Sequence, residues 1–237
     1  MGWIARRVAS AIVLALALMI PQTNATTAYG SGEAGLSAYS GSAPVGQVPA
    51  TEASGAMAAD EQAAVFAVDS FWKRHFTELF GLRYRSPRVA GEYLGSSGPA
   101  CAGHASAPDN AFYCRPEDFL AWDRNLMAVG YRQIGNPWIY LIIAHEWGHA
   151  IQARLPQRQT AEPIELQADC LAGATLQGAA RDGLVTVEAS DADGLARTLA
   201  AAADNYPWTN RHDHGDAQQR ISAFNTGSLG GVLACFP

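Results

Sequence analysis

The chain has 237 residues and a formal net charge of −6, and 49% of its residues are apolar while 16% are charged. This apolar fraction is sufficient for the core of one or two domains and excludes a wholly disordered chain. The acidic balance argues against nucleic-acid binding, because no basic face is available to neutralise a row of phosphates.

Residues 1–25 have the layout of a secretory signal peptide. Two arginines precede an apolar run from Ala9 to Ile20, and small or polar residues follow up to position 25. The run is shorter than the roughly 20 residues that a membrane span requires. We therefore favour an exported, cleaved segment over an uncleaved membrane anchor, which stays open as the alternative. The expected location is extracellular or in the cell envelope, with a membrane contact only if the segment stays uncleaved.

Residues 26–60 predict a flexible linker. They include no lysine or arginine, and 20 of the 35 positions are glycine, alanine or serine. Such a composition buries too little surface to offset the entropy that ordering would cost. We therefore expect one folded domain over residues 61–237.

Within this domain the sequence predicts an α+β fold that is rich in helices. Apolar residues recur at helical spacing over 61–80 and predict an amphipathic helix. Short apolar bursts between glycines and prolines predict a small sheet over 85–123, beside two metal-binding helices. Four further helices are expected, from Asn136-Pro137 to Leu155 with Asn136 as cap, from Pro163 to about Arg181, over about 192–204, and from Asp216 with Gln219 as its capping-box partner.

The four cysteines predict two disulfides. An exported chain enters an oxidising compartment, and the number of cysteines is even. Of the three pairings that four cysteines allow, we favour a local bridge between Cys101 and Cys114 and a long-range bridge between Cys170 and Cys235. Metal binding by the cysteines is the alternative, although the sequence has no CxxC spacing.

The most informative motif is His145-Glu146-Trp147-Gly148-His149, inside the helix expected from Asn136. Histidines four residues apart lie on one helical face, so both imidazoles can reach one metal ion. Glu146 follows the first histidine directly, where a carboxylate can accept a proton from metal-bound water. The rest of the helix is apolar, and buried polar side chains without partners would each cost several kcal/mol. A metal ion is the favoured partner.

Glu165 and Asp169 extend this site from the next expected helix. A catalytic zinc ion takes three protein ligands and keeps a fourth position open for water, and Glu165 is the candidate third ligand. Asp169 lies on the same helical face, where it can accept a hydrogen bond from the outer nitrogen of a ligand histidine. Gly148 and Ala168 are small enough to let the two helices approach closely. The alternative is a salt-bridged surface helix beside a buried histidine pair.

These segments resemble a known family. The runs from Ile143 to His149 and from Glu165 to Gly173 are similar to the motifs of the bacterial neutral zinc metallopeptidases. Its flanking motifs are matched by Phe112-Tyr113-Cys114 with an upstream Cys101, and by His214-Gly215 followed by Gln219-Arg220. The resemblance implies a zincin-like fold and a peptidase with one zinc ion per chain, held by His145, His149 and Glu165.

His214 has two interpretations. Its imidazole could donate to the oxyanion that forms when water attacks a peptide carbonyl. Alternatively, it is a loop residue that packs before the last helix.

The sequence therefore favours a secreted, monomeric zinc metallopeptidase that acts on a peptide or protein substrate, with Glu146 as general base. Two alternatives stay open. One is a non-catalytic, zinc-containing binding module of the cell envelope, in which a free Cys170 thiolate would close the zinc site. The other is a zinc hydrolase of cell-wall amide bonds, which uses the same metal chemistry.

Overall fold

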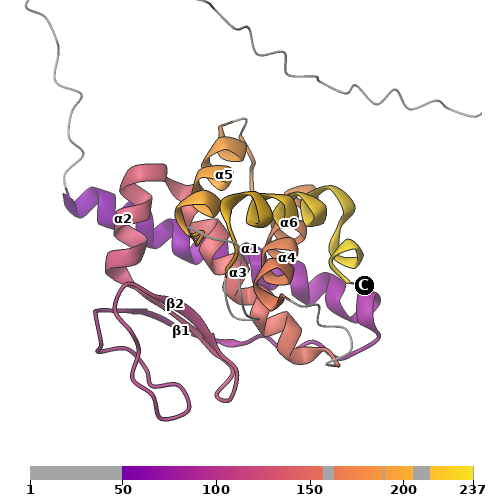
Figure 1. Cartoon of the computed structure of the whole chain (residues 1–237), viewed down its shortest axis with the longest axis horizontal. Helices are drawn as coiled ribbons and strands as arrows, with labels where there is room; N and C mark the ends of the chain where they lie inside the picture. The colour runs from indigo at the N-terminus through magenta and orange to yellow at the C-terminus, as the bar shows by residue number, and fades with distance from the viewer. Residues whose placement is uncertain (1–49, 157–162, 189, 205–213, 237) are drawn as a thin grey trace, which may run out of the picture. The chain divides into compact units, whose positions relative to one another are not determined.

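The computed structural model describes residues 50–156, 163–188, 190–204 and 214–236, so the expected signal peptide and residues 26–49 of the expected linker lie outside the described residues. The described elements form a helix-rich α+β fold with one small sheet, as the sequence predicts (Figure 1). In chain order the elements are α1 (Ala50–Phe80), β1 (Arg88–Tyr93), β2 (Ala111–Cys114), β3 (Phe119–Asp123), α2 (Arg124–Ile134), α3 (Asn136–Arg154), α4 (Ile164–Arg181), α5 (Asp191–Ala201), α6 (Ala217–Gly230) and a final 3-10 turn (Val232–Cys235).

Helix α1 begins earlier than expected. Residues 50–60 are helical, so the flexible linker predicted over 26–60 is wrong in this part. The prediction counted alanine together with glycine and serine, but alanine is the strongest helix former of all residues. This early part also packs, because the side chain of Met57 is only 4% exposed. The ordered chain therefore starts before residue 61.

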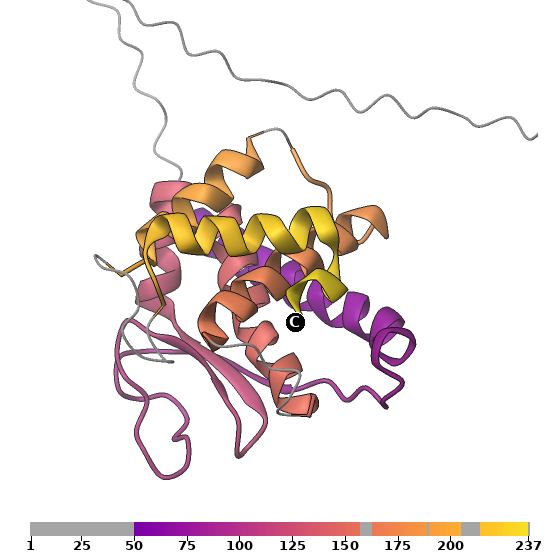
Figure 2. The ribbon, with the colours of Figure 1, turned by 45° about the vertical axis from the view of Figure 1, so that its right-hand side comes forward.

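The three strands form one sheet in the order β1-β3-β2, within the region where the sequence predicts it. Strand β1 is parallel to β3, and β2 is antiparallel to β3. All five residues of β3 are buried, as expected for a central strand. Strand β2 pairs with no other described strand, so its second edge is open. Figures 1 and 2 show the sheet on one side of the helices.

Two helix starts differ from the expectation. Helix α2 was not expected; it follows β3 directly because the carboxylate of Asp123 caps it, accepting from the backbone N–H of Asn125 at 2.7 Å. Helix α3 has Gly135 as its N-cap, one residue before the predicted cap Asn136. Gly135 has φ 100°, a conformation that glycine adopts without strain.

The later helices agree more closely with the sequence. Helix α4 begins directly after Pro163, as expected. Helix α6 has the predicted capping box, in which Asp216 and Gln219 exchange hydrogen bonds. Helix α5 ends at Ala201, somewhat before the expected end near 204.

Helices α3, α4 and α6 pack at short range. Figure 2 shows α6 running across α4. At their closest approach, a Cβ atom added to Gly227 would lie 1.8 Å from the carbonyl oxygen of Cys170, so no larger residue fits there. On the other side, α1 contributes Val68, Trp72 and Phe76, each with 0% exposure, to the same core. Helix α3 is therefore enclosed, as its apolar sequence predicts.

Both disulfides join the favoured pairs. Cys101 is bonded to Cys114, and Cys170 is bonded to Cys235, each with a Cα–Cα distance of 5.6 Å. Disulfides are typical of an oxidising compartment. Among the helices of the described residues, none combines the length and the apolar character that crossing a bilayer would need.

Candidate metal centre

Helices α3 and α4 bring the three predicted ligands together. His145 and His149 lie one turn apart on α3, with ring centroids 4.8 Å apart. Oε2 of Glu165, in the first turn of α4, lies 3.2 Å from Nε2 of His145 and 3.3 Å from Nε2 of His149. His145 and Glu165 are buried. These three side chains could hold one metal ion.

A close contact between α3 and α4 sets the distance from Glu165 to the two imidazoles. A Cβ atom on Gly148 would lie 2.9 Å from the backbone carbonyl oxygen of Ala168 and 3.3 Å from its Cβ atom. The two small residues that the sequence analysis singled out therefore face each other across the interface. Because α3 and α4 approach this closely, the short carboxylate of Glu165 reaches both imidazoles.

The outer ring nitrogens of both histidines are also bonded, which orients the imidazoles. Nδ1 of His145 lies 2.8 Å from Oδ1 of Asp169, and an ionised carboxylate only accepts, so Nδ1 carries the proton. Nδ1 of His149 donates to Oε1 of Gln152 at 2.9 Å. The amide orientation of Gln152 is fixed because its Nε2 donates to the carbonyl oxygen of Ile164 at 2.7 Å. Both Nε2 atoms are thereby aimed at the same point, as metal-ligating histidines require.

Asp169 has a second partner, Arg220 of α6. Nε of Arg220 donates to Oδ2 of Asp169 and Nη2 donates to Oδ1, both at 2.8 Å. A further N–H of the guanidinium donates to the carbonyl oxygen of Ala202. Asp169 is 0% exposed and Arg220 is 3% exposed. Burial alone would raise the pKa of Asp169, but His145 and Arg220 hold this pKa below its usual range.

Arg220 and Gln152 are not predicted as site residues by the sequence. Arg220 belongs to a segment that resembles a flanking motif of the metallopeptidase family. The available signal was a charged residue on the core-facing side of a well-capped helix. Gln152 could have been found by its place three residues after His149, near the end of α3.

Interactions within the cluster shift the pKa values of all three candidate ligands. Burial opposes the charged form of His145, but Asp169 and Glu165 outweigh this effect and raise its pKa to about 10. The pKa of His149 is also raised, against burial, chiefly through its contact with Glu165. Burial alone would raise the pKa of Glu165, yet the two histidines hold it well below its usual range. A metal ion that binds here therefore competes with protons for the imidazoles.

A cavity of about 550 Å³ opens beside these ligands. It is lined by residues of β2, the second half of α3, the start of α4, and His214. Glu146 faces this cavity with 8% exposure. No hydrogen bond or ion pair joins its carboxylate to another described residue. The carboxylate is therefore free to accept a proton inside the cavity.

His214 lies at the rim and is not a close partner of the ligands. Its Nε2 is 3.8 Å from Oε2 of Glu165, and its Nδ1 is 3.9 Å from Oδ1 of Asp204. The side chain is 49% exposed. Its backbone N–H donates to Oδ2 of Asp204 at 2.9 Å. The geometry thus brings His214 to the cavity and leaves both predicted roles open.

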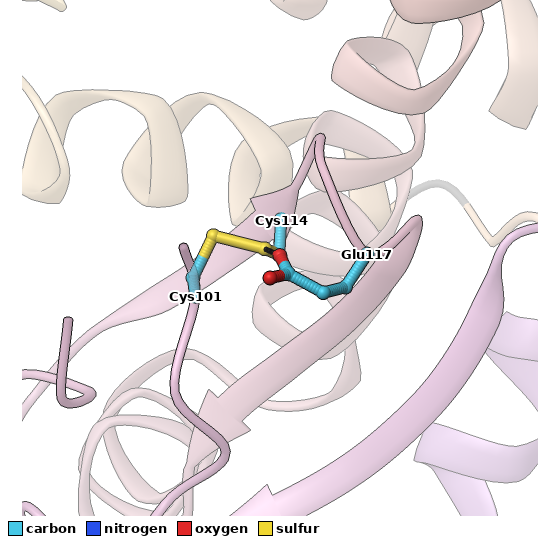
Figure 3. A group of neighbouring side chains, drawn as sticks. All are labelled: Cys101, Cys114 and Glu117. Atoms are coloured by element: carbon cyan, nitrogen blue, oxygen red, sulfur yellow. Dashed lines mark hydrogen bonds between the residues drawn. A yellow bond between two sulfur atoms is a disulfide. The ribbon is translucent and has the colours of Figure 1, made fainter. Parts of the chain in front are cut away.

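The cysteines do not contribute to this centre. Cys170 is in a disulfide and is not available as a fourth ligand. A second group, formed by Cys101, Cys114 and Glu117, also gathers possible donor atoms (Figure 3). Both of its sulfur atoms are in the other disulfide, and the Glu117 carboxylate accepts from the backbone N–H of Ala102 at 3.2 Å. This group is therefore a structural link within the sheet region.

No family model, no curated protein and no solved structure matches this chain. The function is therefore argued from the residues of the centre and the cavity.

Proposed function

We propose that this protein is an exported zinc metallopeptidase in which His145, His149 and Glu165 bind the metal. The observation that carries this proposal is the arrangement of three oriented side chains, two buried and His149 half-buried, at the wall of an open cavity. The resemblance to bacterial neutral zinc metallopeptidases supports the same assignment and the same three ligands.

The donor set fits zinc in type and in spacing. Imidazole nitrogen and carboxylate oxygen are common zinc ligands, and atoms that bind a tetrahedral ion at about 2.0–2.2 Å lie about 3.4 Å from one another. The two distances from Oε2 of Glu165 to the imidazoles are 3.2 and 3.3 Å. Three protein ligands with an open side are typical of catalytic zinc, whereas structural zinc closes with a fourth ligand. The disulfide of Cys170 removes the fourth ligand that the non-catalytic alternative would use.

Bound zinc would supply a Lewis acid for the peptide carbonyl and would lower the pKa of a water molecule. Glu146, directly after His145 and free in the cavity, accepts the proton of the attacking water and passes it to the leaving amine. Asp169 and Gln152 hold the two imidazoles in the tautomer that leaves Nε2 as the ligand atom. His214 is near enough to the cavity to donate to the developing oxyanion.

The lining of the cavity favours an extended peptide as the substrate. Residues Ala111, Phe112 and Tyr113 of the edge strand β2 line the same cavity as Glu146. An open strand edge can form main-chain hydrogen bonds with an extended segment. A peptide that pairs with β2 would therefore pass over the metal ligands.

The decisive experiment measures zinc and hydrolysis in the same preparation. We expect one tightly bound zinc ion per purified chain and zinc-dependent cleavage in a digest that includes both protein and cell-wall peptides. Glu146→Gln should retain zinc and lose hydrolysis, while the matched control Glu61→Gln, a buried glutamate outside the cavity, should keep both. Unchanged hydrolysis by Glu146→Gln would refute the mechanism. Cleavage of only the cell-wall peptides would favour the cell-wall amide hydrolase.

A further inference from the structure

Arg115 is a charged residue of the cavity that the proposed chemistry does not use. It follows directly after β2, is exposed, and lines the cavity together with Glu146 and the metal ligands. Among the described residues, it is the only lysine or arginine that lines this cavity. It also makes no ion pair or side-chain hydrogen bond with another described residue. Within the part of the chain that the structure describes, the cavity therefore holds one guanidinium, and this group has no side-chain partner there.

The neighbouring arginines differ from Arg115 because their side chains form ion pairs or ring contacts within the fold. Arg85 and Arg154 both pair with the carboxylate of Asp118, at 2.8 and 2.9 Å. Arg88 lies over the ring of Phe119, with its guanidinium carbon 4.6 Å from the ring centroid. Each of these side chains contributes to the packing or pairing of the sheet. Arg115 has no such partner among the described residues, and its side chain lines the cavity.

The backbone beneath Arg115 is held firmly. The preceding residue, Cys114, is fully buried and bonded to Cys101. Two residues later, Glu117 ties the turn to the disulfide loop through the backbone N–H of Ala102. Figure 3 shows this link at the end of strand β2. A side chain that starts from a fixed backbone position can define where a ligand group binds.

We propose that Arg115 binds a carboxylate of the substrate and makes the enzyme selective for peptides with an acid group close to the cleaved bond. This inference rests on the proposed peptidase function. A guanidinium binds a carboxylate through two parallel hydrogen bonds, which gives both affinity and orientation. The whole chain has a net charge of −6, so general attraction of acidic peptides is not expected, and the selectivity depends on this local charge.

The carboxylate has two sources, an aspartate or glutamate side chain and the free C-terminus of the peptide. A peptide series separates them. One arm replaces glutamate by glutamine at each position around the cleaved bond, and the other compares free with amidated C-termini. A charged hydrogen bond in a partly open cavity should change kcat/KM by about 10–100-fold at one position.

The test compares wild type with Arg115→Gln and with Arg132→Gln, which removes an exposed arginine that does not line the cavity. We expect Arg115→Gln to reduce the acid-to-neutral ratio of kcat/KM to about one and to leave the cleavage of neutral peptides unchanged. Arg132→Gln should behave as wild type. A wild type without acid preference, or an Arg115→Gln variant that keeps it, would overturn the inference.

Failure of the peptidase function gives a different result, because then no peptide is cleaved by the zinc-loaded wild type. Selectivity is still measurable in that case, as the affinity of the same labelled peptides for zinc-loaded Glu146→Gln. Binding that distinguishes acidic from neutral peptides, and loses this distinction when Arg115→Gln is added, supports the inference. Equal binding of both peptide types overturns it.

Discussion

Replacing Asp169 by asparagine should lower both the stability of the fold and its affinity for zinc. The carboxylate of Asp169 accepts from Nδ1 of His145 and from two N–H groups of Arg220, all at 2.8 Å. Asparagine has nearly the same shape, but it is neutral and has one acceptor oxygen. The guanidinium of Arg220, which is 3% exposed, would then be a buried charge without the carboxylate that it contacts directly.

The two losses have different sizes and different causes. Removal of one partner of a buried ion pair costs about 3–5 kcal/mol in free energy of unfolding. Both side chains are almost fully buried, so solvent screening reduces this cost little. Loss of the group that orients a ligand histidine lowers metal affinity by about 10–100-fold. The stability is lost because Arg220 becomes an unpaired buried charge, and the zinc affinity is lost because His145 is no longer oriented.

A double variant separates these causes. Asp169→Asn with Arg220→Met removes the unpaired charge but leaves His145 without a carboxylate. We expect it to recover most of the stability, measured by denaturant unfolding in the presence of a chelator. It should not recover the zinc affinity, measured by competition with a chromophoric chelator. The effects of the two substitutions should therefore be non-additive for stability but not for zinc affinity.

Two results would refute this reasoning. If Asp169→Asn cost less than about 0.5 kcal/mol and bound zinc as wild type does, Asp169 would have no role in orienting His145. If the double variant regained zinc affinity together with stability, the affinity loss would come from the unpaired guanidinium of Arg220.

Three further changes test other parts of the structure. Burial, with a smaller contribution from a neighbouring glutamate, raises the pKa of Glu61 from 4.5 to about 7. The folded state therefore keeps this proton longer than the unfolded state, and stability falls as pH rises from about 4.5 to about 7. Glu61→Gln should remove this loss and be more stable than wild type at pH 8 by on the order of 2 kcal/mol, with no gain at pH 4; equal unfolding curves at pH 8 would contradict it. Replacing Cys170 and Cys235 by alanine opens a bridge with a sequence separation of 65 and should cost about 4 kcal/mol in denaturant unfolding, whereas a loss below about 1 kcal/mol would show that other contacts hold the C-terminus. Gly148→Ala should force α3 and α4 apart, destabilise by about 1–3 kcal/mol and weaken zinc binding in a chelator titration; unchanged zinc affinity would mean that the helix spacing does not set the ligand distances.

The grouping of the candidate metal ligands could be predicted because its geometry is local. The spacing of His145 and His149 fixes a shared face on any straight helix, whatever the rest of the fold does. Glu165 and Asp169 obey the same rule on the next helix, so placing one of them also places the other. Residue type supplied the remaining information, since polar side chains in an apolar helix need a partner.

The groups that support these ligands depend on long-range packing, and the sequence alone does not specify it. Arg220 reaches Asp169 from a helix 51 residues later along the chain. No periodicity within α6 shows which buried carboxylate its guanidinium meets. The helical start of α1 was missed for a different reason, because alanine is compatible with both a flexible chain and a helix until its partners in the core are known.

The buried charges of the described residues around the centre leave an excess of two negative charges. Three buried carboxylates, those of Glu146, Glu165 and Asp169, lie near one buried guanidinium, that of Arg220, whereas Arg115 at the cavity is exposed. An unbalanced buried charge costs several kcal/mol, so two further positive charges are needed. Without metal, protons on the two histidines are favoured, since the neighbouring carboxylates raise the pKa of both. A divalent ion supplies the same two charges and returns both imidazoles to the neutral form that binds metal. The polar residues that the sequence places on an apolar helix thus belong to a buried set whose charge is compatible with a divalent ion.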